Sequence, residues 1–280
     1  MGEPSFKRMA VQRQPDTRVH CVRGATDGTV GMLISDPAEN VQAWLDIETG
    51  DADGVNGVIE EVAVLPTAAI EDAVYYIVKR EINGSTVRYI EKIAREDQAR
   101  GGAENRMADS FIIQNTSDST GIIAGLSHLE GSSVIIWGST ADLGSGTVAS
   151  GILSQGTCST TFVVGLPYNS MYKSGKLAYG AEAGTALTQQ KKVNHIGLVM
   201  ADVHAQGIKY GPSSTALFNL PLTSRGSSIS TDSVNAQFDE QSIPFGGIWD
   251  ADSRLVLIGT APRPVTVLGA VIQMQTKEKI

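Results

Sequence analysis

The sequence predicts an all-β protein with little helix, folded as antiparallel meander, propeller-like or sandwich sheets in two β-rich regions. Over short stretches apolar residues recur at every second position, which is typical of strands with one buried face. The segments between these stretches are rich in Asn-Gly, Asp-Gly and Asp-Pro pairs, which favour turns. Thirty glycines among 280 residues also suit a chain that turns often.

One hairpin is predicted most clearly. Two runs rich in Val, Ile and Tyr, Ala73 to Ile82 and Thr86 to Ile93, flank the pair Asn83-Gly84. Asn and Gly tolerate the positive φ angles of a type I′ turn, whose twist matches that of two antiparallel strands. We therefore expect these two runs to pair directly across a two-residue turn.

The first region, residues 1–95, is predicted to be an antiparallel meander resembling propeller blades or one layer of a sandwich. The expected strands are Arg18 to Arg23, Thr29 to Ile34, Val41 to Glu48, Gly57 to Leu65, Ala73 to Ile82 and Thr86 to Ile93. The other expected turns lie at Asp27-Gly28, Asp36-Pro37, Asp53-Gly54 and Asn56-Gly57.

Residues 96–120 are predicted to form a linker or long surface loop, because their first half is polar and lacks sustained periodicity. Charge also changes along the chain. Residues 1–110 hold 12 basic and 19 acidic residues, a balance of −7, whereas the remainder holds 10 and 11, a balance of −1. The two regions are expected to face different surroundings.

The second region, residues 121–280, is predicted to be a sandwich-like β domain. The expected strands are Ser132 to Trp137, Thr161 to Leu166, Lys192 to Val203, Leu255 to Gly259 and Pro264 to Gln275, with an exposed polar loop at Ser224 to Ser233. Residues 265–274 are apolar on both faces. Such a strand is either covered on both sides or meets a neighbouring subunit.

Composition excludes some classes of protein. A net charge of −8 argues against a protein that grips nucleic-acid phosphates, but not against one that lets nucleic acid pass. No apolar run reaches the roughly 20 residues that span a bilayer, and no secretory signal is recognisable, so we expect a soluble protein. Cys21 and Cys158 have no metal-site spacing and are expected to be buried free thiols rather than a disulfide.

Two glycine-containing motifs are formal matches to catalytic or cofactor sites. Gly144 to Ala149 fits a dinucleotide-binding pattern, and Gly125 to Leu129 is similar to a nucleophile elbow. Neither is set in the strand-to-helix context that its chemistry requires. We expect a turn at the first and a loop entering a strand at the second, and no cofactor.

Histidines and acidic residues offer three further candidates. His195 and His204 with Asp202 between them could hold a metal, but strand alternation places the two histidines on opposite faces. Cys21, His20 and His128 also lack ligand spacing. Asp250 and Asp252 could bind calcium or form a glycosidase pair, although Asp-Ala-Asp-Ser is also a good turn. We expect no metal and no catalytic residue.

Two surface features remain. Trp44, Trp137 and Trp249 could form a sugar-binding platform with the tyrosines, yet scattered aromatic residues are more often core or interface anchors. The only basic cluster, formed by Lys7, Arg8, Arg13, Arg18 and Arg23, could touch nucleic acid. We interpret it instead as a solvated strand edge or a subunit contact.

Several phrases together resemble one known family. They are Met9 to Val22, Glu61 to Pro66, Tyr76 to Arg80, Val87 to Glu91, Gly125 to Gly131, Val164 to Tyr168 and Pro244 to Asp250. In this order they are similar to the C-terminal half of tail nozzle proteins (tail tubular protein B-like) of short-tailed bacteriophages, and the resemblance covers nearly the whole chain.

The resemblance implies a structural virion protein rather than an enzyme. Its members form a homohexameric tube below the portal and adaptor rings, conduct ejected DNA, and attach tail fibres or spikes. The protein is thus expected in the phage tail after synthesis in the host cytoplasm. The alternative is an adaptor or a receptor- or glycan-binding β module.

Overall fold

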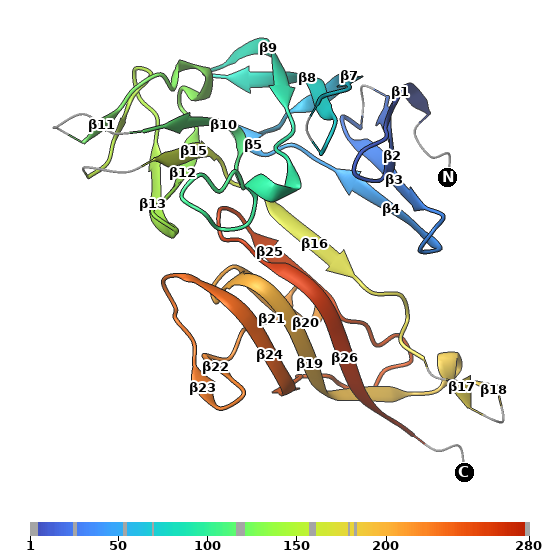
Figure 1. Ribbon diagram of the computed structural model, residues 1–280. Coiled ribbons are helices and arrows are strands. Elements are labelled where there is room, and N and C mark those ends of the chain that lie inside the picture. Colours follow the sequence, from blue (N-terminus) through green and yellow to red (C-terminus); the bar gives the residue numbers. More distant parts are fainter. Residues whose placement is uncertain are drawn as a thin grey trace. The chain divides into compact units, whose positions relative to one another are not determined.

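The computed structural model describes residues 5–24, 27–52, 55–68, 70–115, 121–156, 161–178, 180–181 and 184–277 (Figure 1). The chain folds as two compact units. The first comprises Met1–Ala99, Ala108–Gly138 and Leu143–Tyr168; the second comprises Arg100–Met107, Ser139–Asp142 and Asn169–Ile280. Nearly all regular structure is strand, arranged in several antiparallel sheets, so the all-β prediction is confirmed.

The first unit begins with a four-stranded antiparallel meander. Its strands are β1 (Phe6–Gln12), β2 (Thr17–Arg23), β3 (Val30–Asp36) and β4 (Val41–Ile47), paired in chain order. Val22 and Val30 lie opposite each other on β2 and β3, and both are fully buried in the core. The other face of this sheet carries exposed side chains, including Phe6 and Trp44.

The predicted hairpin is confirmed. Strand β8 (Ala73–Ile82) pairs with β9 (Ser85–Lys92) on one side and with β7 (Val58–Leu65) on the other. Ile82 and Ser85 are direct partners, and the two residues between them, Asn83 and Gly84, have φ angles of 49° and 71°. Both values are positive, as a type I′ turn requires.

A third sheet completes the first unit. Its strand order is β10 (Asp109–Gln114), β15 (Phe162–Leu166), β12 (Ser133–Gly138) and β13 (Ala141–Thr147). All five residues of β15 are buried, as expected of a central strand covered on both faces. Trp137 on β12 is fully buried and anchors this part of the core.

The second unit contains two larger sheets. One has the order β16 (Asn169–Lys173), β25 (Val256–Thr260), β20 (Ile208–Ser213) and β21 (Ala216–Asn219). The other has the order β24 (Val234–Pro244), β19 (Lys191–His204) and β26 (Thr266–Thr276), whose strands are the longest in Figure 1. Residues from both sheets, among them Leu198, Tyr210 and Leu257, share one hydrophobic core.

Short elements fill the connections. Two-residue strands are β5 (Asp51–Ala52), β6 (Val55–Asn56), β11 (Ile122–Ile123), β14 (Leu153–Ser154), β17 (Gly180–Ala181), β18 (Gly184–Thr185), β22 (Thr223–Ser224) and β23 (Ser227–Ser228). Single 3₁₀ turns are η1 (Glu96–Gln98), η2 (Ser127–Leu129) and η3 (Ala186–Thr188). None of the helices in the described ranges is long and apolar enough to cross a lipid bilayer.

The structure differs from the sequence-based expectations at several places. Strand β10 lies inside residues 96–120, where a linker was predicted. The other longer strands that were not among those expected are β1, β13, β16, β20, β21 and β24. The pattern at Gly144 to Ala149, predicted to be a turn, instead supplies the end of strand β13. The expected turn at Asp53-Gly54 and the residue Cys158 lie outside the described residues.

Candidate functional site

Strand β26 is an edge strand with an unusual composition. Its eleven residues, Thr266–Thr276, contain no charged residue and no proline. It pairs with β19 on one side, and no strand in the described part of the chain pairs with its other side. Edge strands of monomeric proteins normally carry lysine, proline or a covering segment, because an open edge pairs readily with another chain.

The two faces of β26 have different environments. Ile272 and Met274 pack against the core of the second unit. Val271 lies opposite Gly197 of β19 on the other face and is 69% exposed, and Leu268 is 66% exposed. The strand is therefore covered on one face only, so the first of the two alternatives, burial of both faces, does not hold within the second unit.

The opposite edge of the same sheet is shielded. The Asp239 amide of β24 donates a hydrogen bond to the Ser224 hydroxyl at 3.0 Å, and the Arg225 amide donates to the Glu240 carboxylate at 3.0 Å. The Arg225 guanidinium also pairs with the Asp239 carboxylate. The small β22–β23 hairpin thus occupies this edge, where the chain also places Pro244 and two charges. One edge is protected against strand pairing, and the other is open.

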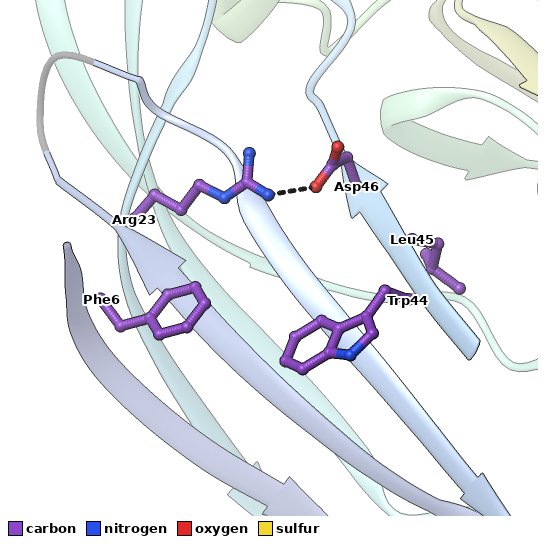
Figure 2. Close-up of a pocket in the computed structure, with 5 residues that line it drawn as sticks. All are labelled: Phe6, Arg23, Trp44, Leu45 and Asp46. Carbon is purple, nitrogen blue, oxygen red and sulfur yellow. Dashed lines mark hydrogen bonds and ion pairs between the residues drawn. The ribbon is translucent and has the colours of Figure 1, made fainter. Parts of the chain in front are cut away.

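A second exposed surface lies on the first unit. Phe6 of β1 and Trp44 of β4 are 55% and 61% exposed, and their ring planes differ by only 3° with centroids 6.4 Å apart. Beside them the Arg23 guanidinium donates to the Asp46 carboxylate at 2.6 Å. Together with Leu45 these residues line a hollow of about 350 Å³, drawn in Figure 2. We call Phe6 and Trp44 the aromatic platform.

The three tryptophans do not form one site. Trp137 is a core residue, as the alternative interpretation of scattered aromatics predicted. Trp44 and Trp249 are both exposed, but they belong to different units. Phe6 lies beside Trp44, although no motif in the sequence pointed to Phe6. The strand register places them on the same face, since Phe6 pairs with Arg23 and Trp44 pairs with Leu33.

The acidic pair forms the predicted turn. The Asp252 amide donates to Oδ1 of Asp250 at 3.1 Å, and the Arg254 guanidinium donates to both Asp252 oxygens at 2.8 and 3.3 Å. The hydrogen bond from Arg254 lowers the pKa of Asp252 below its ordinary value. A glycosidase acid requires the opposite shift.

The structure also shows the surroundings of two of the candidate metal ligands, His204 and Asp202. His204 is buried at the end of β19, where its Nδ1 accepts the Gln206 amide at 3.3 Å. Burial and then the charge of Arg263 lower its pKa. Asp202 has a φ of 48°, so simple strand alternation does not describe its neighbourhood. Within the described ranges, no three His, Cys, Asp or Glu side chains gather closely enough to hold a metal ion.

The basic cluster is largely neutralised. Arg8 pairs with Glu61 at 2.9 Å, Arg18 pairs with Glu96 and Asp16, and Arg23 pairs with Asp46. Cys21 of this stretch is a buried free thiol, as predicted. The segment forms strands β1, which is mostly exposed, and β2, which is partly buried, and three of its five cations are held by carboxylates.

The comparisons identify no family. No protein-family model matches the chain, and no curated protein sequence matches it.

Proposed function

We propose that the chain is a structural virion protein, a tail nozzle or tail-tube component that assembles into a ring. The open edge of β26 carries this proposal. An eleven-residue uncharged edge with exposed Val271 and Leu268 is unfavourable for a monomer, because it can pair with any free strand. The β24 edge of the same sheet is covered by the β22–β23 hairpin, so only the β26 edge is left open to another chain.

A ring requires a particular kind of contact. In a closed ring each subunit uses two different surfaces, so that β26 of one subunit meets another surface of the next. The resemblance to phage nozzle proteins supports a ring of about six copies, with portal or adaptor proteins above and fibres or spikes attached. The net charge of −8 supports a wall along which DNA slides without being held.

The mass of the native particle in solution tests this proposal directly. The wild-type protein is expected to form a particle of about six copies, and Val271→Glu to leave a folded monomer, because a carboxylate at the interface is costly to desolvate. Ile90→Glu is the matched control, since Ile90 is also an exposed apolar strand residue, but on the first unit. A wild-type monomer or a dimer contradicts the ring, and loss of assembly in both variants contradicts the role of β26.

A further inference from the structure

The aromatic platform lies across one face of the first sheet. Phe6 and Trp44 come from the two edge strands, β1 and β4, and reach toward each other over β2 and β3. Gly31 of β3 lies close to the Phe6 ring. A Cβ atom at Gly31 would lie 3.5 Å from the Phe6 ring and 3.6 Å from Nη2 of Arg23. Both are ordinary van der Waals distances, so the Phe6 ring and the Arg23 guanidinium pack close to the backbone of Gly31, and Figure 2 shows the Phe6 and Trp44 rings side by side.

The polar end of the hollow is ordered as well. Arg23 is fixed by Asp46 at 2.6 Å and by Asp27 at 3.6 Å, and its side chain is 19% exposed. Asp46 is more exposed, at 57%, so its carboxylate is open to hydrogen-bond donors from solvent or a ligand. Beside the flat apolar surface the hollow thus offers a fixed guanidinium and an accessible acceptor.

These features select a class of ligand. Flat aromatic faces suit a ligand with an apolar ring face, and a few positioned polar groups at the rim give orientation. The Asp46 carboxylate accepts hydrogen bonds from hydroxyl groups, and the planar Arg23 guanidinium donates them. A saccharide ring combines an apolar face with hydroxyl groups at its edge.

Charge decides between a neutral ligand and an anion. The cation of Arg23 is already offset by Asp46 and Asp27, so that an incoming phosphate or carboxylate meets two negative groups beside one positive group. Arg8 on the same strand as Phe6 is likewise paired, with Glu61. A stacking platform for nucleic-acid bases works with a positively charged groove for the backbone, and here that groove is lacking among the described residues.

We propose that Phe6, Trp44, Arg23 and Asp46 form a binding site for a neutral saccharide. The site belongs to the first unit, whereas the edge strand β26 that carries the proposed ring belongs to the second. The proposal therefore holds or fails independently of assembly.

Calorimetric titration of the full chain tests the site with maltohexaose, cellohexaose and chitohexaose as neutral probes. Hyaluronan hexasaccharide and oligothymidylate are the anionic probes. At least one neutral probe is expected to bind saturably at millimolar concentrations, and Trp44→Ala to weaken that binding by about tenfold or more, as loss of a stacked aromatic ring does. Trp249→Ala is the matched control, because Trp249 is also exposed but lies on the second unit, and it should leave binding unchanged.

Asp46→Asn separates the polar end from the platform. It keeps the size of the side chain but removes the charge that holds Arg23, and it should weaken neutral-probe binding while retaining stacking. Thermal unfolding checks that each variant is folded. Absence of saturable binding by all three neutral probes overturns the proposal, as does tighter binding of an anionic probe. A change in native mass on Trp44→Ala identifies the platform as a protein contact and also overturns it.

Discussion

The hydroxyl of Tyr76 lies 2.7 Å from Nδ1 of His20, and both side chains are buried between the first two sheets of the first unit. On its other side Nε2 of His20 lies 3.3 Å from Oε1 of Gln12, whose amide nitrogen donates to the Gln14 carbonyl at 2.9 Å. Neutral imidazole with its proton on Nε2 satisfies both contacts, since Tyr76 then donates to Nδ1. Burial and then the charge of Arg18 lower the pKa of His20 to about 4.

This pKa predicts a loss of stability in mild acid. The unfolded chain, where the histidine pKa is near 6.5, binds the proton first as pH falls. His20 therefore has no effect above about pH 6.5, and between there and pH 4 it should lower the free energy of unfolding by about 3 kcal/mol. Urea unfolding at a series of pH values measures the loss. The His20→Asn variant should be less stable than the wild type at pH 7, but its free energy of unfolding should fall less between pH 7 and pH 4. If the two proteins lose stability equally over this range, the loss does not come from His20.

The turn between β8 and β9 predicts a strained substitution. Gly84 has a φ of 71°, and no atom lies within 4 Å of a Cβ placed there, so backbone conformation rather than space opposes a side chain. Gly84→Val should cost about 1–3 kcal/mol, because a β-branched residue rarely adopts this conformation. Gly175→Val is the control, since Gly175 is equally open but does not have a positive φ. Equal melting temperatures for the two variants would show that the type I′ turn is not required.

The strands that the sequence predicted share a visible signal. Residues 73–82 are rich in β-branched and aromatic residues, residues 191–204 carry recurrent aliphatic residues, and both form strands within a residue of the expected bounds. Strand β1 lacked this signal, because Lys7 and Arg8 interrupt the apolar pattern and Met9 and Val11 face outward. Local composition predicts a strand well when apolar residues recur along it, and poorly when charged residues interrupt them.

Tertiary contacts explain two of the other differences. In β13 a Cβ at Gly146 would lie 2.6 Å from Cδ1 of Leu153. The glycine therefore lets the Leu153 side chain approach the strand backbone closely, and it does not mark a turn. Strand β10 contains only the short apolar run Phe111 to Ile113, so its strand structure depends on its pairing with β15. The Phe6–Trp44 platform depends on the register of four strands, which the sequence does not specify.

A buried arginine offers a strong test of the first unit. Arg80 has a fully buried side chain and donates to both Glu91 oxygens at 2.7 and 2.8 Å, to Asp109 at 2.9 Å and to the Gly50 carbonyl at 3.0 Å. Burial alone would lower its pKa, but Glu91 and Asp109 outweigh burial and raise it. The guanidinium therefore stays charged and joins β8, β9 and β10.

Replacing this cation should be costly. Arg80→Met leaves Glu91 and Asp109 without their buried partner and is expected to destabilise the unit by about 3–5 kcal/mol. The control is Arg88→Met on the neighbouring strand, because Arg88 also binds a glutamate, Glu60, through two hydrogen bonds but is exposed. It should cost far less than Arg80→Met, because water screens the exposed ion pair. Comparable losses in urea unfolding would contradict the structural role given to Arg80.

Binding to duplex DNA should be weak, and salt should change it little. The chain carries a net charge of −8, and three arginines of its only basic cluster are held by carboxylates, Arg8 by Glu61, Arg18 by Glu96 and Arg23 by Asp46. A protein that contacts several phosphates releases a counterion at each, and its affinity then falls steeply with salt. Fluorescence anisotropy of a labelled duplex at a series of salt concentrations gives the slope of log affinity against log salt.

A slope magnitude below about 2 is expected, since each phosphate contact contributes about 0.9. Glu61→Gln is an informative variant, because it frees Arg8 without placing a new cation on the surface. It should raise the magnitude of the slope by no more than about 0.9, the contribution of one phosphate contact. Tight binding with a steep slope in the wild type would show that the surface holds DNA in place. The idea of a conduit along which DNA slides would then have to be abandoned, even if the native mass establishes a ring.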